Sequence, residues 1–227
     1  MGWDNAEKGF ANMLQIKQLT ITRGTLALVS QFSLCIQNGE VLTLSGVSGS
    51  GKSTVLDWII GNLDAHFSAS GSLWLNGVCC DTLPTEARHI GLLFQDDVLF
   101  AHLSVGQNLA FALPARHKGK KLRRQYIEQT LQDIGLAGFH DRDPATLSGG
   151  QRARVSLMRT LLSEPQALLL DEPFSKLDTT LRSQFRALVF AQIALKSIPT
   201  LLVTHDPADI PAHGRVINLR DWQPPHV

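Results

Sequence analysis

A glycine-rich loop between a short apolar run and a helical pattern constrains the fold of this chain more than any other feature. The loop is GVSGSGKST, residues 46–54, and it matches G-x-x-x-x-G-K-[ST]. Residues 41–44 before it predict a buried strand, and residues 54–61 after it predict a helix. In that setting glycines let successive backbone N–H groups converge on phosphate oxygens. The sequence therefore predicts a phosphate-binding loop, against the alternative of a chance glycine-rich turn.

This loop offers several kinds of ligand for phosphate and metal. Lys52 brings a mobile positive charge to the outer phosphates. The Ser53 hydroxyl suits Mg²⁺, which takes few protein ligands and keeps phosphate and water oxygens. The residues expected to line the phosphate site are Gly46, Val47, Ser48, Gly49, Ser50, Gly51, Lys52, Ser53 and Thr54.

Strand and helix patterns alternate along the chain and indicate an α/β protein with a P-loop NTPase core. Strands are expected at residues 14–21, 32–36, 71–76, 90–94, 167–170, 200–203 and 216–219. Helical spacing covers residues 105–113, 121–135 and 182–195. We therefore expect a mixed, mostly parallel sheet with an N-terminal antiparallel β region. A helical subdomain, at about residues 96–165, is expected to interrupt this core.

The composition is that of an ordinary globular protein and argues against several classes. The chain has 227 residues, of which 44% are hydrophobic and 18% charged, and its formal net charge is +1. That charge provides no basic field for nucleic acid, and the apolar runs are too short to cross a bilayer. The cysteines Cys35, Cys79 and Cys80 complete no zinc-binding spacing, so we expect reduced thiols.

Acidic and polar side chains follow three of the predicted strands. Asp171 and Glu172 end the run ALLL, at the strand end where open α/β sheets bind ligands. Asp171 can hold Mg²⁺, directly or through water, and Glu172 can polarise a water against the terminal phosphate. His205 after TLLV can contact that phosphate or hold Glu172 and water, and Gln95 after IGLLF can ligate Mg²⁺ or the water. The alternatives are an exposed acidic turn and a passive surface histidine.

Four further motifs resemble those of one protein family. The most specific is LSGGQ at residues 147–151; VTHDP at 203–207 resembles a histidine switch loop and LLFQDD at 92–97 a glutamine loop. FSKLD at 174–178 resembles the loop that follows the two acids. Together with the phosphate loop, these motifs resemble the ATP-binding subunits of ABC transporters, specifically of bacterial importers, over residues 14–219.

The resemblance implies an ATPase that uses Mg²⁺ and works as a head-to-tail pair of identical chains. The residues it makes catalytic are Glu172, His205 and Gln95, with Ser53, Gln95 and Asp171 as Mg²⁺ ligands. The residues it places against the partner's ATP are Ser148, Gly149, Gly150, Gln151 and Asp178. It implies a single domain over residues 13–227 after a flexible extension at 1–12.

The resemblance also implies partners and a location. The partners are transmembrane permease subunits and a solute-binding protein, and no nucleic acid is expected. The chain would be cytoplasmic, peripheral on the cytoplasmic face of the inner (plasma) membrane. An ATPase of an exporter or lipid-extraction system is the main alternative. A soluble member acting on DNA or ribosomes would show a long coiled coil or two such domains, and a P-loop kinase would lack LSGGQ.

Three features depart from the family's pattern or lie outside it. The family usually stacks an aromatic residue on adenine near position 23, but no aromatic lies between Thr20 and Gln31. Either Arg23 stacks on the base or the base is loosely held and GTP competes. Lys176, where a small residue is commoner, either tunes signalling between two sites or is a neutral surface change. The basic run at 116–124 indicates a solvated loop and helix start, or a contact with anionic lipid.

Overall fold

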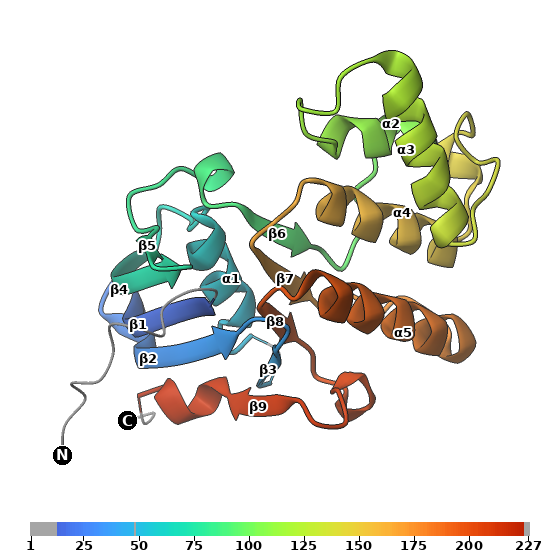
Figure 1. Ribbon diagram of the computed structural model, residues 1–227. Helices are drawn as coiled ribbons and strands as arrows, with labels where there is room; N and C mark the ends of the chain where they lie inside the picture. Colours follow the sequence, from blue (N-terminus) through green and yellow to red (C-terminus); the bar gives the residue numbers. More distant parts are fainter. Residues whose placement is uncertain (1–12, 48, 225–227) are drawn as a thin grey trace. The chain divides into compact units, whose positions relative to one another are not determined.

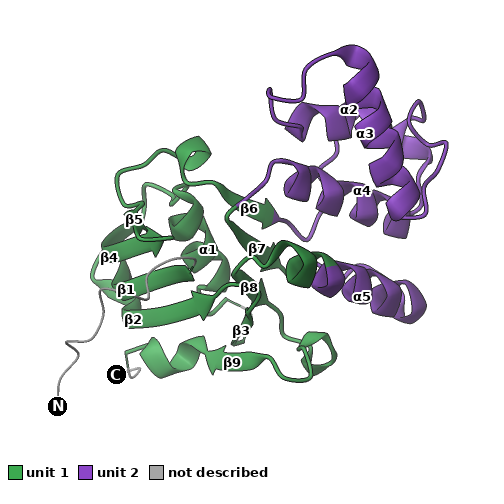
Figure 2. Cartoon of the chain, in the orientation of Figure 1, with its two compact units in different colours: residues 1–92, 166–172, 192–227 green, residues 93–165, 173–191 purple. Residues whose placement is uncertain are grey.

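The computed structural model describes residues 13–47 and 49–224. The expected extension at residues 1–12 and the phosphate-loop residue Ser48 lie outside the described residues. The chain forms two compact units, coloured separately in Figure 2. We call residues 1–92, 166–172 and 192–227 the core unit, and residues 93–165 and 173–191 the helical unit.

The first sheet of the core unit is antiparallel and comes from the N-terminal part of the chain (Figure 1). Its strands lie in the order β2 (Leu26–Gln37), β1 (Met13–Arg23), β4 (Ser68–Leu75) and β5 (Val78–Cys79). The expected antiparallel region is therefore confirmed. The strand expected at 32–36 begins earlier, at Leu26, because Arg23 pairs with Leu26 across a tight turn and extends the β1–β2 ladder.

The second sheet of the core unit is built from parallel pairs. Its strands lie in the order β6 (Ile90–Leu93), β7 (Ala167–Asp171), β8 (Thr200–Val203), β3 (Val41–Ser45) and β9 (Arg215–Asn218). Strand β3 pairs in parallel with β8 and β9, and β7 pairs in parallel with β8. All of β8 is buried, as its continuous apolar run predicts. The α/β prediction is confirmed, and the ends of β3, β7 and β8 meet at one edge of the sheet.

Helix α1 (Lys52–Ile60) and both sheets share one hydrophobic core. Val55, Leu56 and Ile59 of the helix are buried in the same cluster as Leu42 and Leu44 of β3. Burying each such side chain stabilises the fold by about 1.5–3 kcal/mol. The loop that joins β3 to α1 is therefore anchored at both of its ends. Three short 3₁₀ helices complete the unit: η1 (Thr85–Ala87), η3 (Pro207–Asp209) and η4 (Leu219–Trp222).

The helical unit contains three complete α-helices and most of a fourth. They are α2 (Val105–Ala112), α3 (Lys120–Asp133), α4 (Gly149–Leu162) and the first part of α5 (Thr179–Lys196), with a short 3₁₀ helix η2 (Pro144–Thr146). Helix α2 packs against α3 and α4. Both α2 and α4 begin with a capping box, which satisfies two N–H groups at the helix start. The structure places α2, α3 and α5 within three residues of their predicted bounds.

The basic run at residues 116–124 is tied into the helical unit. Arg123 Nη2 donates to the Ala110 carbonyl oxygen at 2.6 Å, near the end of α2. Such contacts satisfy carbonyls that a helix end leaves without partners. Arg116 and Arg124 form ion pairs with acidic side chains of the same unit, namely Glu164, Glu128 and Asp141. Two of the three arginines of the run are therefore paired with acidic side chains, and the third is hydrogen-bonded to backbone carbonyls.

Candidate functional site

The loop between β3 and α1 has the backbone that an anion cradle requires. Gly49 and Gly51 adopt left-handed φ angles of 78° and 94°, which residues with a side chain rarely adopt. Gly51 is also the N-cap of α1, so the loop leads into a helix end whose first N–H groups have no intrahelical acceptor. Among the described residues, the buried Ser50 hydroxyl finds no hydrogen-bond partner. An anion bound in the loop would supply one.

Lys52 is held inside this loop. Its side chain is only 6% exposed, and Nζ donates to the carbonyl oxygens of Gly46 at 2.9 Å and Val47 at 3.0 Å. A lysine ammonium has three N–H donors. Two of them fix the position of the charge within the loop, so the side chain is oriented before any phosphate arrives.

Asp171, at the end of β7, meets the first turn of α1. The Ser53 hydroxyl donates to Asp171 Oδ2 at 3.3 Å. Burial raises the pKa of the Asp171 carboxyl, and the hydrogen bond from Ser53 partly opposes this. A hydroxyl and a carboxylate oxygen this close form the hard oxygen donor set that Mg²⁺ prefers. The residues present therefore fit a divalent cation beside the loop.

Glu172 and His205 form a pair at the ends of β7 and β8. His205 Nδ1 and Glu172 Oε1 are 3.0 Å apart, and the Glu172 backbone N–H donates to the Val203 carbonyl at 2.9 Å. Glu172 adopts a φ of 47°, a left-handed conformation that costs a non-glycine residue roughly 1–3 kcal/mol. This turn directs its side chain away from the course of β7. The predicted proximity of glutamate and histidine is present in the structure.

A buried hydrogen-bond network supports the loop that carries His205. The Thr204 hydroxyl donates to Asp209 Oδ2 at 3.0 Å and accepts from the Asp206 N–H at 3.1 Å. Thr204 and Asp209 are both nearly inaccessible to solvent. The role of Asp209 was not predicted from the sequence. The available signal was Asp206 before Pro207, which indicates the start of a short helix.

A cavity of about 350 Å³ in the core unit joins the loop to the β1–β2 hairpin. Asp171 and Glu172 line it together with loop residues Gly49, Gly51, Lys52, Ser53 and Thr54. Its other walls are Arg23, Leu26, Leu28 and Phe67. Arg23 was predicted from register to be near the base, and it lines this cavity. Leu26, Leu28 and Phe67 were missed, because Phe67 lies more than forty residues from Arg23 in sequence and is brought near it by the pairing of β1 with β4.

The segment 147–151 forms the start of α4 in the helical unit. Ser148 is the N-cap: its hydroxyl accepts from the Gln151 N–H at 3.3 Å, and Gln151 Oε1 accepts from the Ser148 N–H at 2.9 Å. Gly149 and Gly150 occupy the next two positions, whose N–H groups have no intrahelical acceptor. A Cβ at Gly150 would lie 3.3 Å from Leu181 Cδ2, so glycine also permits close packing there.

Gln95 and Asp178 also belong to the helical unit. Gln95 is exposed. Asp178 Oδ1 accepts from the backbone N–H groups of Thr180 at 3.1 Å and Leu181 at 3.0 Å, at the start of α5. This capping role was not predicted. Close by in sequence, Lys176 forms an ion pair with Asp96. The structure thus gathers Lys52, Ser53, Asp171, Glu172 and His205 in the core unit, and holds Gln95, Asp178 and residues 148–151 in the helical unit.

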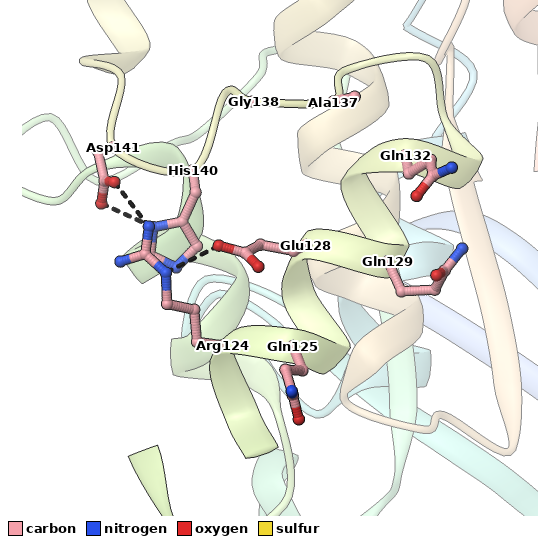
Figure 3. Close-up of a pocket in the computed structure, with 9 residues that line it drawn as sticks. All are labelled: Arg124, Gln125, Glu128, Gln129, Gln132, Ala137, Gly138, His140 and Asp141. Carbon is pink, nitrogen blue, oxygen red and sulfur yellow. Dashed lines mark hydrogen bonds and ion pairs between the residues drawn. The ribbon is translucent and has the colours of Figure 1, made fainter. Parts of the chain in front are cut away.

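The helical unit has a cavity of its own, of about 520 Å³, between α3 and the segment 137–141 (Figure 3). Arg124 Nη2 donates to Asp141 Oδ2 at 2.8 Å, and Arg124 Nε donates to Glu128 Oε1 at 2.8 Å. His140 Nδ1 lies 2.8 Å from Asp141 Oδ1. These charged groups satisfy one another. None of the residues predicted to act on a nucleotide lines this cavity.

Comparison with known proteins agrees with the class of ATPase that this site defines. Residues 29–175 match the family described as ABC transporter. The chain is 49% identical over 210 residues to the uncharacterized ABC transporter ATP-binding protein YnjD of Escherichia coli (strain K12), covering 92% of this chain and 96% of that protein. The chain therefore belongs to the ABC transporter family, and it is an ATP-binding ATPase of that family.

Two further relatives have names that state a transported solute. The thiamine import ATP-binding protein ThiQ of Haemophilus influenzae is 39% identical over 198 residues, covering 87% of this chain and 90% of ThiQ. The sulfate/thiosulfate import ATP-binding protein CysA of Gloeobacter violaceus is 42% identical over 186 residues. That match covers 82% of this chain but only 53% of CysA, so the chain spans about half the length of that relative.

Proposed function

We propose that this chain powers solute import by hydrolysing ATP between two of its own copies, arranged head to tail, beneath separate permease subunits. The observation that carries the proposal is the division of the predicted residues between the two units. The core unit holds a phosphate loop, an acid pair and a histidine. The signature segment 147–151 starts a helix of the helical unit, with two glycine N–H groups left for an outside acceptor.

In the core unit, the phosphate loop and Lys52 bind the phosphates of ATP. Two of the Lys52 N–H groups are taken by loop carbonyls, so the third is available to a phosphate oxygen. Ser53 and Asp171 would hold Mg²⁺, and Gln95 is a further proposed ligand. Bound there, Mg²⁺ supplies charge neutralisation for the phosphate oxygens. Its binding would also favour the ionised form of Asp171, whose pKa burial raises.

Glu172 is the proposed general base. Its carboxylate accepts the proton of the attacking water, and His205 at 3.0 Å keeps the carboxylate in one orientation. His205 is 62% exposed on its side chain, so it is also accessible to the terminal phosphate. Hydrolysis then breaks the bond between the β and γ phosphates, and the water oxygen ends on the released phosphate.

In the helical unit, the start of α4 is suited to an anion that comes from another chain. The capping box occupies the N–H groups of Ser148 and Gln151, whereas those of Gly149 and Gly150 point out of the helix end. The helix dipole favours negative charge there. We assign Ser148, Gly149, Gly150 and Gln151 to the ATP held by the partner copy, and Asp178 to the same interface. ATP shifts the equilibrium toward the closed pair only to the extent that it binds the closed state more tightly than the open state.

The remaining parts of the proposal concern the membrane. Within the described residues, no helix combines the length and apolarity needed to span a bilayer. Permease subunits would therefore form the path, a solute-binding protein would deliver the solute, and this chain would lie on the cytoplasmic face of the plasma membrane. The names of ThiQ and CysA, both import ATP-binding proteins, support this direction of transport.

Transport by reconstituted vesicles tests the proposal. The chain and its permease subunits are placed in vesicles with the ATPase facing outwards, and radiolabelled thiamine or sulfate is loaded inside. An importer moves solute toward the face that carries the ATPase, so we expect ATP-dependent efflux that is lost with Lys52→Ala. In a second arm the label is supplied outside, and ATP-dependent uptake into the vesicles without efflux in the first arm would support the exporter alternative and contradict the proposal.

A further inference from the structure

No aromatic residue lies between Thr20 and Gln31, around the turn of the β1–β2 hairpin, but the structure brings one to this region from the segment before β4. Thr22 of β1 pairs with Ser68 of β4 in an antiparallel register. Arg23 directly follows Thr22 in the chain, and Phe67 directly precedes Ser68. On its other side, Arg23 pairs with Leu26 of β2. Leu26, Arg23 and Phe67 therefore come from three neighbouring chain segments, and all three line the cavity beside the phosphate loop.

Phe67 is fixed in place by the turn that precedes β4. Its backbone N–H donates to the Asp64 carbonyl at 3.0 Å, and the His66 N–H donates to Asp64 Oδ1 at 2.8 Å. The Phe67 side chain packs against the hydrophobic core of the unit and is partly exposed. One side of the ring is thus supported by the core while the residue lines the cavity beside the phosphate loop.

Apolar groups and phosphate-binding groups line the same cavity. Leu28 lies next to the phosphate loop: a Cβ placed on Gly51 would be 3.9 Å from Leu28 Cδ2. Leu26 and Phe67 line the cavity together with Lys52 and Ser53 of the phosphate-loop region. A nucleotide combines the same two kinds of group, with a flat apolar base joined through ribose to a chain of phosphates.

We propose that Phe67, supported by Leu26 and Leu28, binds the purine base of ATP in place of an aromatic residue from the hairpin. This inference rests on the proposed nucleotide site. The three side chains have no polar atoms, so they recognise the faces of the base and not its edge. Arg23 borders this surface and serves the base edge or ribose. We therefore expect ATP and GTP to bind with similar affinity, and nucleotides without a purine to bind less tightly.

Three probes separate base binding from phosphate binding: Mg·ATP, Mg·GTP and inorganic tripolyphosphate, which has neither base nor ribose. Titration calorimetry is carried out on the full chain carrying Glu172→Gln to suppress turnover. Phe67→Ala is expected to weaken ATP and GTP binding by about 5- to 100-fold, the loss typical of one aromatic stack on a base. Binding of tripolyphosphate is expected to stay within twofold, and Phe67→Tyr to restore ATP binding.

Control variants keep the outcome interpretable. Phe67→Leu preserves apolar volume against the core without an aromatic face, and it should give an ATP affinity between wild type and Phe67→Ala. Phe111→Ala removes an exposed phenylalanine of the helical unit and should change no affinity. Lys52→Ala should weaken ATP and tripolyphosphate alike; if it does not, the proposed phosphate site is wrong, whatever Phe67 does.

Two results would overturn the assignment of Phe67. One is an ATP affinity within twofold of wild type in Phe67→Ala combined with a large loss in Arg23→Ala, which would make the arginine the stacking group. The other is an equal loss of ATP and tripolyphosphate in Phe67→Ala with an unchanged melting temperature, which would assign Phe67 to the phosphate loop.

Discussion

The core unit and the helical unit carry their proposed functional residues in different ways. In the core unit, residues from two strand ends and the first turn of α1 contact one another: Ser53 bonds Asp171, and Glu172 bonds His205. In the helical unit, the signature segment bonds chiefly to itself through the Ser148–Gln151 capping box. The first is a site with a loop, a base and a cavity, whereas the second is a helix end with two outward N–H groups.

This difference gives a physical reason for the two anion-binding features proposed for one chain. A helix N-terminus alone favours an anion by only about 0.3–1 kcal/mol when it is exposed, which is too little to bind a nucleotide. The same helix end can instead lie over a phosphate that another loop already holds. Its interaction then adds to the binding free energy, and the phosphate does not have to be immobilised a second time. The helical unit is thus suited to complete a site, and the core unit to begin one.

The largest expected effect comes from removing the base in the core unit. Glu172→Gln keeps the shape of the side chain but cannot accept the proton of the attacking water, so ATP turnover should fall by about 100-fold or more. Steady-state phosphate release measures it, and ATP binding should be retained. Unchanged turnover would remove Glu172 from the base role and leave the cavity without an assigned catalyst.

An intermediate effect is expected on stability at Asp171, one of the proposed Mg²⁺ ligands. Burial raises the pKa of Asp171, so the ionised carboxylate is disfavoured in the folded, nucleotide-free chain. Because the pKa of Asp171 is higher in the folded chain than in the unfolded chain, its contribution to the free energy of unfolding depends on pH. The contribution is fully present below the unfolded pKa and is lost as pH rises through the folded pKa. At pH 7 Asp171→Asn should therefore raise the melting temperature, by at most about 2–4 °C.

The same variant has an internal control. The gain in melting temperature should shrink as pH falls and vanish below the ordinary pKa of an aspartate, where the carboxyl is protonated in both the folded and the unfolded chain. The additional stabilisation by Mg·ATP over ATP alone should be lost in the variant. A lower melting temperature for Asp171→Asn at pH 7 would show that the carboxylate stabilises the free protein.

The smallest effect is expected in the helical unit, at Lys176. Its ion pair with Asp96 joins side chains that are 54% and 74% exposed, and such pairs contribute about 0.2–1 kcal/mol. Lys176→Ala should change turnover by less than about threefold. Lys176→Arg, which keeps the charge, is the matched control. A loss above tenfold in Lys176→Ala alone, at unchanged melting temperature, would favour the signalling interpretation.

The two units also differ in how far sequence predicted them. The phosphate loop, Asp171 and Glu172 follow strands with distinct apolar runs, so their meeting at one sheet edge was predictable from topology. The cavity wall was not, because Phe67 reaches Arg23 only through the register of β1 with β4. The strand predicted at residues 32–36 is shorter than β2, because apolar and polar residues do not alternate strictly over residues 26–31. The start of β2 is decided by its pairing with β1.

In the helical unit, sequence located the helices but not the local bonds that occupy polar residues. The capping role of Asp178 and the pairing of the arginines at 116–124 depend on side-chain geometry between segments that have no fixed spacing. The resemblance of a motif to a family implies what its residues do in an assembly of several chains. The structure of one chain shows only the bonds that those residues make within that chain.

Complementation between two inactive variants tests most directly whether two copies share each site. Lys52→Ala disables the phosphate loop and Ser148→Arg disables the helix end, so neither variant alone forms an intact site, and both should be inactive. Mixed at equal concentration, half of the random pairs have one intact site, so about a quarter of wild-type ATPase activity should return. Wild-type activity from Ser148→Arg alone, or no recovery in the mixture at high protein concentration, would contradict the shared site.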